Sequence, residues 1–375
     1  MDFTLTTEQQ MLSDSVARFV QNEYDFDART KIVAAGAGGA PANWRIFAEN
    51  GWLAACCPEA FGGFGGGAIE AAIIAEQFGR GLVIEPWLGC AVLATQTLLA
   101  SDDAAVKAEW LPALCEGRRR LAVAWSEPGS RGAPHIAETL AEGEGSGLRL
   151  TGRKTLVLGG VGADAYLVSA RDARGIGLFL VDADAAGLTA TPTPLHDGSI
   201  AASLVLDGVP ARRLAGDGLP ALETGLAHAI CALCAELVGG MERAIEISAD
   251  YLRTRKQFGV TIGSFQSLQH RIADMAAEKE LARSTLFAAL ASIENDDAIQ
   301  RAPVLSGAKA LVADAARNVC AQAIQLHGGI GMTEECAVGH YFKRAVVAET
   351  LFGGRSVHEA RCTQALIAEL REDAA

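Results

Sequence analysis

The chain has 375 residues, of which half are hydrophobic and 21% are charged, and its formal net charge is −13 at pH 7. This length exceeds what a single core usually holds, so we expect two or three well-buried globular domains without a long disordered part. The negative charge argues against a nucleic-acid partner, although local cations or helix N-termini can still bind an anionic ligand.

The opening residues and the apolar segments bear on location. The sequence begins with Met, Asp and Phe, with no basic region and no apolar core after them, so we expect no signal peptide. The apolar segment Leu219–Gly240 contains two glutamates and a histidine, which argues against a membrane span. We therefore expect a cytoplasmic protein without membrane contact.

The nine cysteines should stay reduced in such a compartment. Cys231 and Cys234 form a CxxC pattern, but they lie among apolar residues of one helix and no second pair follows. We interpret both as small core residues and expect no metal site.

The first 118 residues have the periodicity of helices. A capping box that begins at Thr7 and ends at Gln10 precedes an apolar face that includes Val16 and Phe19. Further helical patterns cover residues 44–50, 68–78, 91–99 and 105–115. The glycine-rich segment Pro58–Gly67 follows no clear strand and lacks a P-loop lysine, so we expect a plain loop.

The pattern changes twice along the rest of the chain. Short apolar runs separated by Gly, Asp and Pro predict strands at 121–125, 148–150, 155–158, 165–168, 177–181 and 202–206. Longer amphipathic patterns then predict an antiparallel helical bundle at 221–253, 265–294, 302–326, 334–351 and 356–371. We therefore predict three domains, at 1–118, 119–215 and 216–375.

The segment Tyr251–Met275 carries the most informative chemistry. Its helix pattern breaks at Gly259 and resumes after Ser264, a plausible N-cap. Arg255 and Lys256 lie beside the glycine turn and suit a diphosphate, because a guanidinium can bind two phosphate oxygens at once. Considered alone, the segment also fits a solvated helix end with a phenylalanine in the core.

This segment does not stand alone, because its motif Arg-Lys-Gln-Phe-Gly and the later Phe-Gln and Ala-Asp-Met resemble the FAD-binding signature of acyl-CoA dehydrogenases. The resemblance covers essentially the whole chain. It implies an N-terminal α-helical domain, a middle β-barrel or sandwich domain and a C-terminal four-helix bundle. It also implies FAD as cofactor and α,β-desaturation of an acyl-CoA thioester, in which a glutamate removes the α-proton while a hydride leaves to the flavin.

Each FAD in this family is shared between subunits, and the residues that reach a neighbour's flavin are present here. By resemblance, Arg255 binds the pyrophosphate and Phe258 and Gln266 are neighbouring FAD contacts. Gln325 and Gly329 occupy cofactor-contact positions in a Gln-x-x-Gly-Gly-x-Gly segment. A glycine helix cap with a buried histidine is the alternative interpretation of that segment.

The residues that would hold the subunit's own flavin are mostly replaced. Ser126 lies in a loop that resembles the family's Thr-Glu-Pro-x-x-Gly-Ser and could offer a hydroxyl. Leu156 and Leu158 stand where the family has a flavin-stacking tryptophan and a hydrogen-bonding threonine, and leucine donates no hydrogen bond. Gly353 falls on the catalytic glutamate and Arg355 on a threonine that faces the cofactor.

No other residue is a convincing base. Val357 falls on the glutamine of some relatives, and Ala229 falls on the alternative base position in the first bundle helix. Glu223 lies nearly two turns from Ala229 and projects differently. Glu349 fits an exposed helix position, and His228 fits an ordinary core or surface histidine better than a base.

This asymmetry favours one function over three alternatives. We interpret the chain as the base-lacking subunit of a heteromeric, α2β2 acyl-CoA dehydrogenase with a homologous partner. The resemblance implies ring-containing acyl-CoA substrates, such as sterol side-chain thioesters, and an electron-transfer flavoprotein as acceptor. The alternatives are a self-sufficient homotetramer with a relocated base, a flavin-dependent monooxygenase on the same fold, and a non-enzymatic scaffold that binds a homologue.

Overall fold

The computed structural model describes residues 4–293 and 298–372, which fall into two units. The sheet unit comprises Lys31–Ala71 and Ile84–Ile230, and the bundle unit comprises Met1–Thr30, Ala72–Val83 and Cys231–Ala375. These units follow contacts within the chain and do not test the predicted domain boundaries near residues 118 and 215, which stay predictions.

The sheet unit is built on one eight-stranded sheet of order β6-β7-β3-β2-β4-β5-β8, with β1 paired to β4. The strands are β1 (Leu121–Ala124), β2 (Leu140–Glu142), β3 (Arg149–Leu158), β4 (Ala165–Asp172), β5 (Gly175–Asp182), β6 (Leu188–Pro194), β7 (Ile200–Pro210) and β8 (Arg212–Arg213). The first six residues of β4 are all buried, as expected for a strand covered on both faces. Its core includes Tyr166 and Phe179.

The predicted β-domain is confirmed, although three strands were not predicted. The patterns at 148–150 and 155–158 belong to one strand, β3, which is interrupted by a bulge between Lys154 and Val157. β2 and β8 are too short to leave a pattern. β6 contains two prolines and is mostly exposed, which is possible because it pairs on one side only.

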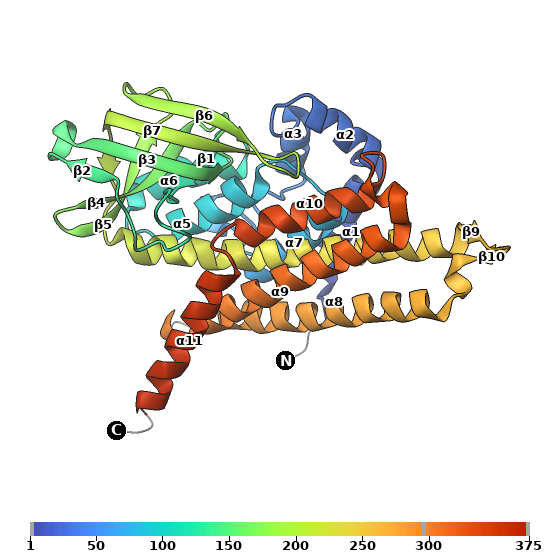
Figure 1. Ribbon diagram of the computed structural model, residues 1–375. Helices are drawn as coiled ribbons and strands as arrows, with labels where there is room; N and C mark the ends of the chain where they lie inside the picture. Colours follow the sequence, from blue (N-terminus) through green and yellow to red (C-terminus); the bar gives the residue numbers. More distant parts are fainter. Residues whose placement is uncertain (1–3, 294–297, 373–375) are drawn as a thin grey trace. The chain divides into compact units, whose positions relative to one another are not determined.

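Apart from a short two-stranded hairpin described below, the remaining elements are helices (Figure 1). They are α1 (Thr7–Glu23), α2 (Phe26–Ala34), α3 (Pro41–Glu49), η1 (Glu59–Phe61), α4 (Ala68–Gly81), η2 (Leu88–Ala94), α5 (Thr95–Leu99), α6 (Ala104–Cys115), η3 (Gly145–Gly147), α7 (Gly218–Thr254), α8 (Gln266–Ile293), α9 (Ala298–His327), η5 (Gly328–Met332), α10 (Ala337–Thr350) and α11 (Arg355–Glu372). The predicted order of helical, β and helical segments is confirmed, and Pro58–Gly67 is a loop apart from the short η1. The short helix α2 was not predicted, because its only buried residue is an arginine, Arg29.

Two predicted helix starts are wrong in detail. The capping box of α1 consists of Thr6 and Gln9, one residue earlier than predicted, and both of its reciprocal hydrogen bonds are present. Ser264 does not cap α8, because its hydroxyl donates to the Thr261 carbonyl within the short 3-10 helix η4 (Ile262–Ser264). α8 begins only after Phe265.

Within the bundle unit, α9 packs against α8, α10 and α11. α4 approaches α7 closely, because a Cβ atom on Gly79 or Gly239 would lie 1.9 Å from a carbonyl oxygen of the facing helix. Among the described residues, α7 is the one helix long and apolar enough to cross a membrane, but 78% of its most apolar stretch is buried. Cys231 and Cys234 lie fully buried in α7, as predicted, and burial raises the pKa of both thiols.

Candidate cofactor site

One candidate surface is the tip of the bundle unit, where α7 ends and α8 begins (Figure 1). The chain turns there through a hairpin of β9 (Lys256–Gln257) and β10 (Val260–Thr261). Phe258 and Gly259, the two turn residues, both have positive φ, +55° and +82°. The Phe258 side chain is 90% exposed, and its ring lies edge to face with the Phe265 ring, at 6.2 Å between centroids.

The exposure of Phe258 removes one interpretation of this segment. A phenylalanine tucked into the core was the simpler expectation, and that expectation is wrong. A non-glycine residue in the left-handed region is unfavourable, and its exposed ring gains no burial in return. This combination points to a contact outside the chain.

The second predicted cofactor segment lies at the same tip. Tyr251, one turn before Arg255, stacks on His327 at 4.4 Å between ring centroids, and its hydroxyl donates to the His327 carbonyl at 3.4 Å. His327 lies between Gln325 and Gly329, and its Nδ1 is hydrogen-bonded to the carbonyl one turn earlier in α9. The buried histidine of the alternative interpretation is thus present. Through Tyr251, it also joins the Arg255 motif to the segment that contains Gln325 and Gly329.

The chemistry at this tip suits an anionic group. Arg255 and Lys256 are exposed, and neither has a carboxylate partner within the described part of the chain. Arg253, two residues before Arg255, differs because it pairs with Asp250 at 2.8 Å. A Cβ atom on Gly329 would meet nothing within 4 Å, so the surface there is open. Two unpaired cations beside open backbone fit the pyrophosphate of FAD.

Gln266 is exposed at the first position of α8, and Gln325 is exposed near the end of α9. The hairpin that precedes Gln266 is tied to the end of α7 by the Ile262 amide, which donates to the Arg255 carbonyl at 2.9 Å. The structure therefore brings all five predicted groups of this set to one end of the bundle unit, whereas Ser126, which was predicted with the other set, belongs to the sheet unit. Their roles toward FAD remain predictions.

The other candidate surface is the loop around Ser126 in the sheet unit. The Thr155 amide donates to the Ser126 carbonyl at 2.8 Å, which joins the loop to β3. Behind it lies a buried ion pair, in which Lys154 Nζ is 2.6 Å from Glu127 Oε1 and neither residue exceeds 4% exposure. Glu127 also accepts two backbone amides and the Thr139 hydroxyl.

Burial and the ion pair together determine the pKa values of Lys154 and Glu127. Burial lowers the pKa of Lys154 to about 8. Burial acts to raise the pKa of Glu127, but the charge of Lys154 and the surrounding hydrogen bonds hold it below its usual range. Both groups therefore bind each other inside the sheet unit, and neither is available to a ligand.

Beside this loop, β3 carries aliphatic side chains at the two positions where the resemblance implies contacts to a flavin. Leu156 occupies the bulge of β3 with φ +51°, and both Leu156 and Leu158 are half-buried. The backbone is thus bent at the predicted tryptophan position, while the side chain there offers no hydrogen bond to a flavin edge. This surface alone does not fit the polar part of a flavin.

The loop expected to carry the base contains no carboxylate. Gly353 is buried with φ +106°. Arg355, at the start of α11, pairs with Asp314 at 3.1 Å and with Glu359 at 2.6 Å. The Glu349 carboxylate is ion-paired with an arginine of α9. None of these groups is placed as a free base.

Two buried polar side chains beside this loop were not predicted. Lys309 donates to three backbone carbonyls and is 1% exposed, and His358 is fully buried. Neither ring nitrogen of His358 has a hydrogen-bond partner among the described residues. The signal that could have revealed Lys309 is a lysine within the apolar pattern of α9.

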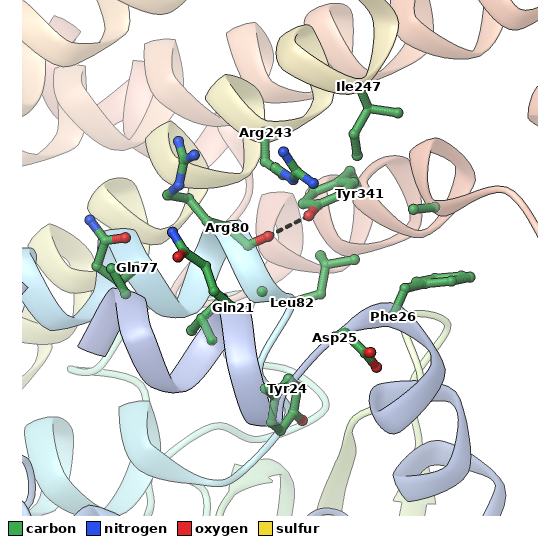
Figure 2. A pocket seen from close by; sticks show the side chains of 14 residues that line it. Gln21, Tyr24, Asp25, Phe26, Gln77, Arg80, Leu82, Arg243, Ile247 and Tyr341 are labelled. Carbon is green, nitrogen blue, oxygen red and sulfur yellow. Dashed lines mark hydrogen bonds between the residues drawn. The ribbon is translucent and has the colours of Figure 1, made fainter. Parts of the chain in front are cut away.

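A cavity of about 360 Å³ lies in the bundle unit between the ends of α1 and α4 and the sides of α7 and α10 (Figure 2). Its two cations are neutralised, because Arg80 pairs with Glu242 and Glu246, and Arg243 pairs with Glu246. The Tyr341 hydroxyl is also used, since it donates to the Arg80 carbonyl. The cavity therefore differs from the hairpin tip, where the cations are unpaired.

Comparison with known proteins completes this description. Family models described as the N-terminal, middle and C-terminal domains of acyl-CoA dehydrogenase match residues 6–118, 122–209 and 216–367. "Acyl-CoA dehydrogenase FadE27" of Mycobacterium tuberculosis is 31% identical, over 83% of this chain and 84% of the relative. "Acyl-CoA dehydrogenase IpdE2" of Mycolicibacterium smegmatis is 30% identical, over 93% and 96%.

Two solved structures of similar chains are also informative. A variant of the Tcur3481–Tcur3483 steroid ACAD superposes with a TM-score of 0.91 at 31% identity, covering 98% of this chain and all of that chain. A chain of the ChsE4–ChsE5 complex from Mycobacterium tuberculosis superposes with a TM-score of 0.89 at 29% identity, covering 98% and 99%.

Proposed function

Because this chain belongs to the acyl-CoA dehydrogenase family, we propose that it is the base-lacking subunit of a heteromeric enzyme and completes the flavin site of a homologous partner. The observation that supports this most strongly is the division of its cofactor residues. The unpaired cations Arg255 and Lys256 and the exposed ring of Phe258 project from the bundle tip. The positions that would hold the chain's own flavin carry leucines.

The similar chains support a heteromeric assembly. The names of two structural neighbours describe a two-component steroid ACAD and a two-component complex. By analogy, this chain would assemble as α2β2 with a related acyl-CoA dehydrogenase subunit in the cytoplasm. The substrate would be an acyl-CoA with a bulky, ring-containing acyl group, and the electrons would pass to an electron-transfer flavoprotein.

In this assembly the reaction is divided between two chains. The partner's carboxylate removes the α-proton of the thioester, and bound FAD supplies the acceptor for the β-hydride. This chain contributes binding energy and orientation: Arg255 would hold the pyrophosphate bidentately, with Phe258, Gln266 and Gln325 beside the same cofactor. Gly353 can remove no proton, so the chain supplies no acid–base step at that position.

Flavin absorbance per chain, measured on this protein purified alone, tests the proposal. We expect no stoichiometric FAD on the isolated chain, and about half a flavin per total chain after it is mixed with a glutamate-bearing homologue. One FAD per chain in the isolated protein would instead support a self-sufficient homotetramer, and desaturation by that protein would require a base elsewhere. No gain in FAD content or in desaturation on mixing with the homologue would contradict shared sites.

A further inference from the structure

Lys309 is a buried cation of the bundle unit with no carboxylate partner in residues 4–293 and 298–372. It lies in α9, and its Nζ donates to the carbonyls of Ala348, Glu349 and Gly353 at 3.0, 3.2 and 3.4 Å. An ammonium group has three donors, so these three acceptors satisfy it completely. Burying a charge is costly unless the charge is both paired and hydrogen-bonded. Lys309 is hydrogen-bonded but has no carboxylate partner among the described residues, so we ask what its burial contributes.

The three carbonyls belong to the end of α10 and to the loop that follows it. The last carbonyls of a helix have no partner within the helix, and a cation is favourable at that end. The loop Leu351–Gly354 then passes through two left-handed residues, Phe352 at φ +60° and Gly353 at φ +106°, before α11 begins. The left-handed region is unfavourable for a phenylalanine, so this loop conformation requires support from its surroundings.

We propose that Lys309 is a positioning residue that fixes the loop Leu351–Gly354, and with it the backbone at the position where the family carries its glutamate. It joins the end of α10 to the far side of the loop, since Ala348 and Gly353 lie five residues apart and share one donor. The loop is thus held in one conformation although none of its side chains is a catalytic group. This role belongs to the isolated chain and does not depend on which subunit holds the flavin.

The electrostatics around Lys309 give this role a measurable signature. Burial lowers its pKa to about 8. The titratable groups that face it are Cys234 of α7, Glu349 of α10 and His358 of α11, and Arg361 of α11 acts on His358. Burial raises the pKa of Cys234 to about 12 and lowers that of His358 to about 4, so neither titrates between pH 7 and 10. The Glu349 carboxylate is ion-paired.

The direction of the pH effect follows from linkage. When the loop opens, Lys309 reaches water, where its pKa is 10.5. Between pH 8 and 10.5 the open state therefore binds a proton that the closed state has lost. Opening becomes harder as the pH rises through this window, by up to about tenfold per pH unit, and it is independent of pH below about 8. The uncharged amine still has two N–H donors, so two of the three carbonyls keep a hydrogen bond and the loop stays held.

Limited trypsin digestion of the full chain tests this proposal, because Arg355 follows the loop directly. Cleavage after Arg355 requires the segment to open, whereas Arg174 in the exposed turn between β4 and β5 provides an internal reference. At pH 7.5 we expect Lys309→Met to raise the Arg355-to-Arg174 cleavage ratio at least about tenfold, because three buried carbonyls lose their donor. Lys279→Met, which removes a buried but carboxylate-paired lysine of α8, should leave the ratio within about twofold.

A pH series on the unmodified protein keeps the test decisive if Lys309→Met does not fold. We expect a constant cleavage ratio from pH 6.5 to 7.5 and a steep fall above pH 8.5. Lys309→Arg retains charge and donors, so it should stay resistant to cleavage but lose the pH dependence. An unchanged ratio in Lys309→Met, or a flat pH series in the unmodified protein, would overturn the positioning role.

Discussion

The bundle tip and the loop around Ser126 are the two surfaces that we predict from the family resemblance to face FAD, and they differ in whether their charged groups are exposed or buried. At the tip, Arg255 and Lys256 are exposed and unpaired within the described residues. At the loop, Glu127 and Lys154 are buried and bind each other. The tip retains ligand-binding chemistry, whereas the loop retains only its scaffold.

This difference supports the proposal that the loop keeps its fold without the side chains that would bind a flavin. The buried ion pair and the bulge of β3 keep the loop in a defined shape. The leucines at 156 and 158 nevertheless offer no polar contact. A scaffold without its ligand groups is what we expect of a subunit whose loop no longer binds a flavin but still has to fold.

The largest effect should come from breaking the scaffold of the sheet unit. Lys154→Met leaves the Glu127 carboxylate buried without its cation, which should lower the free energy of unfolding by about 3–5 kcal/mol. Urea denaturation measures this loss. The double variant Glu127→Leu, Lys154→Met removes both charges and should recover much of the stability. Equal loss in the single and double variants would show that the pair itself, rather than an orphaned charge, decides stability.

The next largest effect should be a loss of stability in acid caused by His358 of the bundle unit, which, unlike Lys154 and Glu127, has no ion-pair partner among the described residues. Burial lowers the pKa of His358 to about 4 from 6.5. The unfolded chain therefore binds a proton between pH 6.5 and 4 that the folded chain does not, and stability falls as the pH falls through this window. The loss should reach about 3 kcal/mol by pH 4.

Urea unfolding of the protein and of His358→Met at pH 7 and pH 4.5 measures this loss. His358→Met cannot titrate, so it should lack this part of the acid sensitivity. His358→Gln, which is polar and does not titrate either, is the control that separates charge from polarity. If all three proteins lose stability equally between the two pH values, the acid sensitivity comes from other groups.

A third effect concerns the ligand chemistry of the tip. In the complex with a glutamate-bearing homologue, Arg255→Ala removes a charge-assisted contact and should weaken FAD binding by about 1.5–3 kcal/mol, roughly ten- to a hundredfold. Flavin fluorescence titration measures this change. Arg253→Ala is the matched control, since Arg253 is also exposed but already paired with Asp250. Equal affinities for both variants would remove Arg255 from the cofactor site.

The order of elements and the tip residues could be predicted from the sequence, because helix periodicity and the motif around Arg255 are local patterns. The hydrogen-bond partners of Lys309 and the exposure of Phe258 could not. Lys309 lies within the apolar pattern of α9, but that pattern does not show that the end of α10 and the loop after it bring three carbonyls to the ammonium group. Phe258 looks like a core residue until the hairpin turn carries it away from the bundle. Both depend on tertiary contacts that no local pattern encodes.

The smallest effect on stability should come from Phe258 itself, and it separates folding from assembly most cleanly. Phe258→Ala removes a ring that is 90% exposed, so the free energy of unfolding of the isolated chain should change by less than about 0.5 kcal/mol. If the ring is buried against the partner or its flavin, the same variant should weaken complex formation about tenfold or more, as measured by sedimentation or titration calorimetry. Leu366→Ala, on a 56% exposed apolar side chain of α11, is a control outside the tip. If Phe258→Ala changed neither stability nor complex formation, the prediction would be wrong. The strain of a phenylalanine at positive φ would then have no compensating gain in folding or in assembly.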